Sequence, residues 1–447
     1  MKNKLKSFNT TRYILLGFMI VILFGSLLLK LPISSATGES LPYIDALFTA
    51  TSATCVTGLV TLPTFSTWSL FGKIVILCLI QIGGLGVITV MAGFMIFLNK
   101  KFGLKDYLLI QDTFNLNSME GLKKFVRKVI FGTFLIEIIG ALLYMLVFVP
   151  EFGLKGVWIS IFNSISAFCN AGMDIISGNS LEAYVLNPIV NFVTCALIII
   201  SGLGFIVWWD VIRIIKNKKG IKALTLHSKI VFVTTAILLA VGTLGVLAGE
   251  YNNPLTIKEY SLIQKLEVAF FQSVTLRTAG FATISQQNLT NATALLSLIL
   301  MFIGGSPAGT AGGIKTVTIA VLFVTMLSMI KNKNEITVFN RRLAHNDIRK
   351  AIAVIFMSFV IASTSTFLLS LVTDAPFIDI AFETVSATAT VGLSRNLTSL
   401  LNVYGKLIII ATMYFGRVGP ISLALALNTK KKNTNVIKHP VEEITIG

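Results

Sequence analysis

The sequence predicts an all-α polytopic membrane protein in which four tandem repeats of outer helix, pore helix and inner helix surround a central pore, with eight spanning helices. Three observations predict it: the hydropathy of the chain, the placement of its charges and a short segment that recurs four times. Hydrophobic residues make up 54% of the 447 residues and charged residues only 13%, with a mean hydropathy of +0.82. A water-soluble protein cannot cover its surface with this composition, so the bilayer is the expected solvent.

Eight apolar stretches are each long enough to cross a bilayer, which takes about 20 helical residues. They cover residues 13–33, 70–98, 126–150, 188–212, 228–249, 293–330, 351–372 and 404–427. We treat each stretch as one spanning segment, apart from 293–330, which is too long for a single straight crossing.

The net charge of +17 comes from basic residues that are not scattered. Of the 37 Lys and Arg residues, 27 fall in the stretches 1–12, 99–128, 213–229, 331–350 and 430–447. These are the two ends and the connections after every second apolar stretch. The positive-inside rule therefore predicts that both termini and these loops are cytoplasmic. Because basic loops beside a membrane explain the charge, we expect a lipid membrane and no nucleic acid as the partner of these residues.

A segment of sixteen residues recurs between the two members of each pair of apolar stretches. It reads IDALFTATSATCVTGL at 44–59, WISIFNSISAFCNAGM at 158–173, LEVAFFQSVTLRTAGF at 266–281 and IDIAFETVSATATVGL at 378–393. The four copies align without gaps, with Phe at the fifth position and Gly at the fifteenth. The glycines, Gly58, Gly172, Gly280 and Gly392, are 114, 108 and 112 residues apart, so one repeat is about a quarter of the chain.

This repeat divides the chain into nine segments. The pore repeats cover 13–98, 126–215, 228–330 and 351–427, and the cytoplasmic segments cover 1–12, 99–125, 216–227, 331–350 and 428–447.

Each recurring segment is too short to cross the membrane and ends in a loop that contains Gly. Non-helical backbone survives at membrane depth only when it is buried in protein or lines a watery cavity, and four such loops around one axis meet this condition. Successive carbonyl oxygens can replace the water shell of a cation, and Gly permits the dihedral angles that turn them toward the axis. We therefore predict an ion-binding selectivity filter, with the cation bound at filter residues only. Its residues are Cys55, Val56, Thr57 and Gly58, then Cys169, Asn170, Ala171 and Gly172, then Arg277, Thr278, Ala279 and Gly280, and finally Ala389, Thr390, Val391 and Gly392.

The strings CVTG, CNAG, RTAG and ATVG at these positions resemble the four filter segments of the Trk/Ktr/HKT superfamily of potassium translocation subunits. The run GGSPAGTAGGIKT at 304–316 is a second match, and the resemblance covers nearly the whole chain. With eight spans, the chain is most similar to the membrane subunit of bacterial Ktr systems. The resemblance implies a potassium-channel-like fold and potassium uptake across a bacterial plasma membrane, with sodium as a candidate activator.

The same resemblance implies the partners. It implies a homodimer with one pore in each protomer, and a cytosolic regulatory ring of the RCK type that binds a nucleotide. The nucleotide is thus expected on the partner, and no covalent cofactor is expected on this chain. In the superfamily, Gly at all four filter positions goes with a preference for potassium, and here the first position is Gly58. None of the four segments contains a full TVGYG string, which implies few ion sites and modest selectivity.

The third inner segment contains a break. Residues 304–313 include five glycines and Pro307, which a continuous helix cannot hold. We interpret it as a mobile gating loop beneath the filter, which matches the superfamily's gating loop; a packing kink between helices is the alternative. The gating candidates are Gly304, Gly305, Ser306, Pro307, Gly309, Thr310, Gly312, Gly313, Lys315 and Arg417.

Three basic residues near the pathway have competing interpretations. Arg417 lies inside the last apolar stretch, where a cation is costly unless it faces protein or water, so it is either a charge that guards the pathway or half of a buried ion pair. Lys315 either belongs to the gate or extends to the cytoplasmic interface. Arg277 sits within a filter segment, and we expect its side chain to point away from the axis and pair with an acid or with carbonyl groups behind the loop.

The remaining polar residues favour a transporter over an enzyme. Glu137, Asp210 and Glu383 are isolated acids, for which structural pairing or a position at the membrane interface is a better interpretation than a proton relay. The sequence contains no HExxH, nucleophile elbow, P-loop or carboxylate cluster, so no enzymatic activity is expected. A secondary carrier coupled to protons or sodium also uses broken helices and midplane acids, and it is the alternative function.

Overall fold

The four outer helices are the longest helices in the described part of the chain, at 21 to 31 residues. The computed structural model describes residues 10–98, 103–114, 121–332 and 335–419. The outer helices are α1 (Thr10–Lys30), α7 (Leu122–Phe152), α11 (Leu226–Glu250) and α15 (His345–Ser370). In the part of the chain that the structure describes, these are the four single helices long and apolar enough to span a membrane. Between 22% and 33% of the residues in their apolar windows are buried, as expected of helices that face lipid on one side.

The four recurring segments form short helices that are buried inside the outer ones. They are α2 (Tyr43–Cys55), α8 (Leu154–Cys169), α12 (Leu262–Thr275) and α16 (Phe377–Ala389). Pro42 and Pro376 directly precede two of them and restrict the backbone at the start of the helix. Ser261 caps α12, and its side chain and that of Gln264 form a reciprocal capping box.

The first two inner segments are bent pairs of helices, which differs from the single crossings expected for 70–98 and 188–212. The first consists of α4 (Leu70–Leu85) and α5 (Val87–Phe97), which meet at 96°, and the second of α9 (Pro188–Gly202) and α10 (Phe205–Lys216), which meet at 93°. Gly86 and Gly204 stand at the two bends with φ of +84° and +88°, a conformation that ends a helix and that only Gly adopts without strain.

The third inner segment is interrupted, and the described part of the fourth ends at a glycine. The third consists of α13 (Asn291–Phe302) and α14 (Thr316–Ile330) on either side of a loop. The fourth, α17 (Val403–Val418), ends at Gly419, whose φ is +90°. The rest of the stretch predicted to reach residue 427 lies outside the described residues.

The connections contain short elements. They are η1 (Pro32–Ser34), α3 (Thr64–Thr67), α6 (Leu104–Phe114), η2 (Glu182–Tyr184), η3 (Ile221–Ala223), η4 (Gln286–Asn288) and η5 (Thr398–Leu400). A two-stranded antiparallel hairpin, β1 (Thr337–Val338) and β2 (Arg341–Arg342), lies between α14 and α15 and was not expected in an all-α chain. It is too small to change the fold class.

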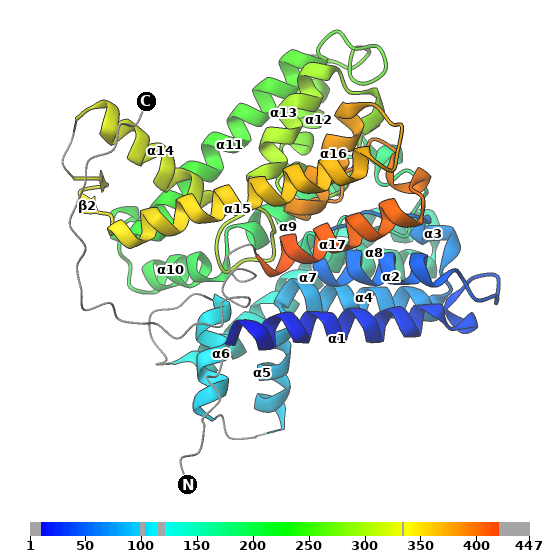
Figure 1. Cartoon of the computed structure of the whole chain (residues 1–447), viewed down its shortest axis with the longest axis horizontal. Helices are drawn as coiled ribbons and strands as arrows, with labels where there is room; N and C mark the ends of the chain where they lie inside the picture. The colour runs from blue at the N-terminus through cyan, green and yellow to red at the C-terminus, as the bar shows by residue number, and fades with distance from the viewer. Residues whose placement is uncertain (1–9, 99–102, 115–120, 333–334, 420–447) are drawn as a thin grey trace.

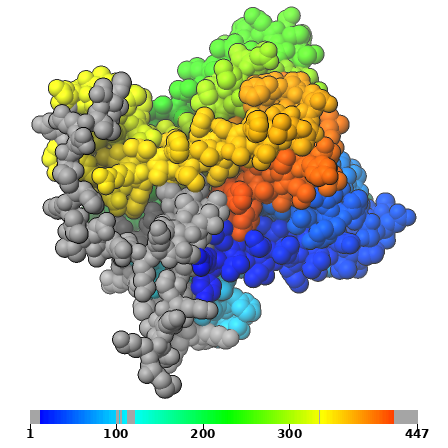
Figure 2. Space-filling view, viewed as in Figure 1, coloured from blue at the N-terminus to red at the C-terminus, as the bar shows by residue number. Residues whose placement is uncertain are grey.

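The repeats close into a ring because each inner helix packs on the pore helix of the next repeat. α4 contacts α8, α9 contacts α12, α13 contacts α16, and α17 returns to α2. Figure 1 shows α1, α4, α2, α17 and α15 following one another and roughly parallel, with α5 and α6 roughly perpendicular to α1 near its N-terminal end. On the face shown in Figure 2, the first repeat, in blue, borders the fourth, in orange. The first and fourth repeats are therefore neighbours, which closes the ring, and the four pore helices lie at its centre.

Candidate selectivity filter and gate

The four predicted filter segments have the same backbone conformation. Val56, Asn170, Thr278 and Thr390 occupy the thirteenth position of the repeat, and all are left-handed, with φ between 51° and 70°. Two residues later, the four glycines also have positive φ, from 63° to 98°. Non-glycine residues rarely adopt this conformation, and such strained residues persist where the surrounding structure holds them, often at functional sites. Four matching pairs indicate one structural motif repeated four times.

The four glycines lie against one another in cyclic order. A Cβ atom built on Gly58 would come within 3.0 Å of the carbonyl oxygen of Ala171, and one on Gly172 would meet that of Ala279. In the same way, Gly280 faces the carbonyl oxygen of Val391, and Gly392 faces that of Thr57. Each glycine thus faces the fourteenth residue of the following repeat. The four segments therefore meet around one narrow space, at a distance where only Gly fits.

Hydroxyl groups on the pore helices hold these segments from behind. Ser52 Oγ accepts a hydrogen bond of 3.0 Å from the backbone N–H of Gly58, and Ser386 Oγ accepts the equivalent bond from Gly392. In the second and third repeats, Ser166 and Thr275 instead donate to the carbonyl oxygens of Met173 and Phe281. Every filter segment is thus bonded to its own pore helix, which fixes its position across repeats.

The third pore helix, α12, is shifted by one residue relative to the gapless alignment of the four segments. The Phe at the fifth position is fully buried in the first, second and fourth repeats, but Phe270 is 39% exposed, and its neighbour Phe271 is buried in its place. The supporting hydroxyl group also shifts by one residue, from the ninth position to Thr275 at the tenth. The supporting hydroxyl residue is therefore five positions before the filter glycine in the third repeat and six positions before it in the others. The gapless alignment is right for the filter residues, but it is wrong by one residue for the third pore helix.

Two ion pairs hold the fourth repeat, one to the first repeat and one within the fourth repeat itself. Lys406 on α17 pairs at 2.6 Å with Asp45 in the first turn of α2, and Arg395 pairs at 2.6 Å with Asp379 in the first turn of α16. Arg395 also donates to the carbonyl oxygen of Gln286 in the third repeat. Asp45 and Asp379 also lie in the first turns of their helices, where a negative charge is favourable. Neither basic partner was predicted. Lys406 and Asp45 are 361 positions apart, so nothing local in the sequence relates them.

The predicted gating residues form a compact loop between α13 and α14. Ile303 and Ile314 pair as a parallel bridge at its two ends, and Ser306 Oγ lies 2.9 Å from Thr316 Oγ1. A Cβ atom on Gly312 would collide with the side chain of Thr390 and the carbonyl group of Ala389. The loop therefore lies directly against the fourth filter segment.

This loop also contacts the second repeat. Thr310 Oγ1 accepts a hydrogen bond of 3.2 Å from Asn170 Nδ2 and donates to the carbonyl oxygen of Phe168. At the bend between α9 and α10, the N–H of Phe205 donates to the carbonyl oxygen of Ala308, and Gly202 accepts from the N–H of Ser306. The backbone groups of the loop thus find partners at membrane depth, as they must.

Arg417 and Lys315 both bond to this loop. The guanidinium of Arg417 donates to the carbonyl oxygen of Thr310 at 2.8 Å and to that of Gly83 on α4. Within the described residues no carboxylate pairs with Arg417, so the interpretation as half of an ion pair is not supported there. Lys315 Nζ donates to the carbonyl oxygen of Ala311 at 2.6 Å and does not extend away from the loop.

Arg277 departs from expectation. It is only 7% exposed, and among the residues that the structure describes no acid or carbonyl group pairs with its side chain; Nε is buried without a hydrogen bond. It lines a small cavity with Gly202, Leu239 and Gly305. The expected pairing behind the filter is therefore wrong for the described part of the chain.

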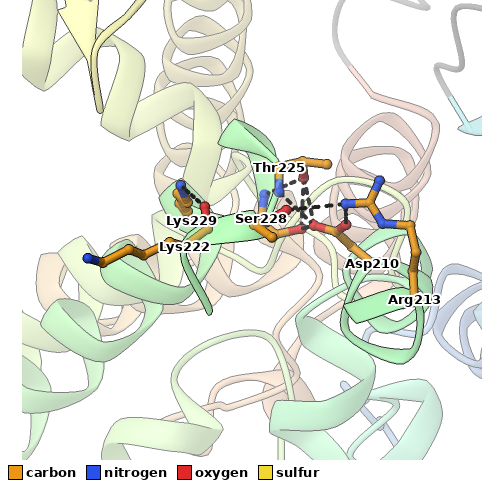
Figure 3. Close-up of polar contacts among 7 residues, drawn as sticks. Asp210, Arg213, Lys222, Thr225, Ser228 and Lys229 are labelled. Carbon is orange, nitrogen blue, oxygen red and sulfur yellow. Dashed lines mark hydrogen bonds and ion pairs between the residues drawn. The ribbon is translucent and has the colours of Figure 1, made fainter. Parts of the chain in front are cut away.

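The three isolated acids all have structural partners, which agrees with the preferred interpretation. Figure 3 shows Asp210 on α10, whose carboxylate accepts hydrogen bonds from Thr225 and Ser228 at the start of α11 and pairs with Arg213 at 2.5 Å. Glu383 accepts hydrogen bonds from Ser394 and Thr398. The contacts of Asp210 fasten α10, and with it the bend that touches the gating loop, to the next outer helix.

The arrangement defines a class: a helical membrane protein with four pore loops around one axis and a loop beneath them. Comparison with known proteins gives the family. The family model TrkH, described as a cation transport protein, matches residues 2–436. The chain therefore belongs to the TrkH family of cation transport proteins, and it is not an enzyme, as the sequence predicted.

Relatives and a solved structure agree with this family. The chain is 40% identical to the potassium/sodium uptake protein NtpJ of Enterococcus hirae over 99% of this chain and 98% of that protein. It is 39% identical to the Ktr system potassium uptake protein B of Bacillus subtilis, covering 98% and 97% of the two chains. The crystal structure of the potassium transporter TrkH from Vibrio parahaemolyticus has the same fold, with a TM-score of 0.76 and 18% identity over 96% of this chain and 86% of that one.

Proposed function

We propose that this chain is the ion-conducting subunit of a Ktr-type system that takes up potassium through a gated selectivity filter. The observation that carries the proposal is the cyclic contact of the four filter glycines, each against the fourteenth residue of the next repeat. Backbone carbonyl groups around one axis are the ligands that potassium pathways use. The relatives named as potassium uptake proteins support potassium as the cation.

Unpartnered oxygen atoms beside the filter support the same cation chemistry. The buried hydroxyl oxygens of Thr57, Thr278 and Thr390 have no hydrogen-bond partner among the described residues. Hydroxyl oxygen is an acceptable ligand for a hard cation, and a buried hydroxyl group without a partner is costly. These three atoms lie in the filter segments, where a potassium ion would use them in addition to carbonyl groups.

We further propose that residues 304–313 form the gate, with Arg417 holding its closed position. The hydrogen bond from Arg417 to Thr310 and the close contact of Gly312 with the fourth filter segment support it. Opening requires only that these few contacts be exchanged for others, so a partner with a modest preference for one state can shift the equilibrium.

The same proposal extends to the assembly. The chain works as a homodimer in a bacterial plasma membrane, with both termini in the cytoplasm, and a cytosolic RCK-type ring that binds a nucleotide regulates it. Basic residues after every second apolar stretch support the orientation. Sodium is a candidate activator, since one relative is named a potassium/sodium uptake protein.

Growth at low potassium tests the proposed function. A host that lacks its own potassium uptake systems should grow when it expresses this chain with an RCK-type subunit, and grow less with the chain alone. A chain that inserts in the membrane yet gives no rescue in either case would refute the proposal.

A further inference from the structure

Glu137 lies halfway along outer helix α7 and is buried, with 3% of its surface exposed. Its carboxylate accepts hydrogen bonds from Gln81 Nε2 at 3.1 Å to Oε1 and 3.2 Å to Oε2. Gln81 belongs to α4 of the first repeat. A carboxyl group at membrane depth is costly, and these bonds reduce that cost while joining the first repeat to the second.

Both members of this pair contact the second filter segment. Cys169, its first residue, has its Sγ 3.8 Å from Gln81 Oε1 and 3.9 Å from Glu137 Oε1. The backbone of Glu137 also accepts a hydrogen bond of 2.6 Å from Ser164 on the same pore helix. Cys169 directly precedes the left-handed Asn170. Glu137 and Gln81 therefore support the filter from behind, at the residue where the pore helix ends.

The third repeat shows what the fold itself requires at this position. There Ser273 donates to the carbonyl oxygen of Leu239, as Ser164 donates to that of Glu137. Three residues later, Gly242 and Gly140 lie against the same two serines. Leu239 is thus the counterpart of Glu137.

Leu239 lines a cavity together with Arg277. Arg277 directly precedes the left-handed residue of its filter segment, as Cys169 does in the second repeat. Because Leu serves in the third repeat, the acid in the second is not needed to build the fold.

We propose that Glu137 is a positioning residue of the pathway: through Gln81 and Cys169 it holds the second filter segment in the geometry that favours potassium over sodium. Selectivity depends on the number and placement of oxygen ligands, so a segment released from behind discriminates less. This inference rests on the proposed function, since it assigns a role within the same filter.

The test compares potassium and sodium uptake by purified dimers in liposomes, per folded molecule. Glu137→Leu reproduces the residue of the third repeat and removes the hydrogen bonds. The matched control is Glu250→Leu, which removes another buried acid of an outer helix whose carboxylate bonds Thr290 in a connecting loop and no filter residue. The double variant Gln81→Glu with Glu137→Gln exchanges acid and amide and keeps one hydrogen-bonded pair.

We expect Glu137→Leu to lower the ratio of potassium to sodium affinity about tenfold, the effect of losing about 1.4 kcal/mol of differential binding. The exchanged pair should restore this ratio, and Glu250→Leu should leave it unchanged. Wild-type discrimination in Glu137→Leu, or an equal loss in Glu250→Leu, would overturn the proposal. If Glu137→Leu does not fold, Gln81→Leu removes the same bonds and is judged by the same ratios. A wild-type chain that carries no potassium would instead refute the proposed function.

Discussion

A side chain at any of the four filter glycines would meet the carbonyl group of the neighbouring filter segment. This contact, and not the positive φ alone, distinguishes them from other glycines. Gly38 has a φ of +75°, yet a Cβ atom there would meet nothing within 4 Å. A substitution at Gly38 therefore tests backbone strain alone, whereas one at a filter glycine also obstructs the proposed ion site.

Substitution of the filter glycines should therefore alter ion selectivity. Gly58→Ser and Gly392→Asp should each reduce potassium affinity or the preference for potassium by about tenfold or more, a change that corresponds to about 1.4 kcal/mol. Gly38→Ser should leave both unchanged. Uptake of potassium and sodium by each variant is the measurement, and wild-type affinity and selectivity in both filter variants would remove the basis for the filter assignment.

Arg417 joins two elements from different repeats. It bonds the gating loop at Thr310 and the first inner helix at Gly83. Arg417→Gln removes the charge and weakens these bonds, so we expect higher cation flux at unchanged folding. Arg417→Lys keeps the charge without the forked geometry and should give an intermediate flux. Lower thermal stability of Arg417→Gln, with no change in flux per folded molecule, would indicate a purely structural residue.

At the scale of elements, the sequence predicted the break in the third inner segment but not the bends in the first two. In the apolar stretch 293–330, five glycines and a proline predicted a break in the helix, and the structure has a loop there. The bends at Gly86 and Gly204 were not predicted, although Gly83 and Gly84 precede the first and Gly202 precedes the second. Neither group of glycines contains a proline, and small residues are also common where straight membrane helices pack closely. The register shift in α12 was hidden for a similar reason: Phe270 and Phe271 are both Phe, so the alignment cannot tell which one is buried.

The two bends offer a matched test of contact with the gate. Gly86 and Gly204 have almost the same φ, but a Cβ atom on Gly204 would collide with the carbonyl oxygen of Pro307 in the gating loop, whereas one on Gly86 would meet only Thr89 at 3.8 Å. Gly204→Ala should therefore change flux and its dependence on the regulatory ring more than Gly86→Ala does. Equal effects in uptake assays with and without the ring would mean that strain at the bends, and not contact with the loop, is responsible.

Removal of the gating loop tests that element directly. Deletion of residues 306–312 eliminates Thr310, the partner of Arg417 and Asn170. We expect high flux that no longer responds to the ring or its nucleotide. A deletion variant that folds, dimerises and still shows low, ring-dependent flux would leave 304–313 as a packing kink.

At the scale of the whole molecule, the four repeats share a backbone plan and differ in side chains. The recurring Gly and the spacing of about a quarter of the chain predicted this shared backbone structure, because every repeat must bring a filter loop close to the same axis. The contacts between repeats are all different: Gln81 with Glu137, Asn191 with Glu267, Arg395 with Gln286 and Lys406 with Asp45. Sequence could not predict these partners, since pairing across repeats depends on how the ring closes.

The driving force for uptake tests the central claim, a continuous filter pore rather than a carrier. Purified protein in liposomes should accumulate potassium when the only gradients are those of potassium itself and the membrane potential, with no gradient of sodium or protons. The rate should follow the electrochemical gradient of potassium and fall in Gly392→Asp. Uptake that requires a sodium or proton gradient, with a fixed number of driving ions for each potassium ion, would contradict the pore and establish a coupled carrier.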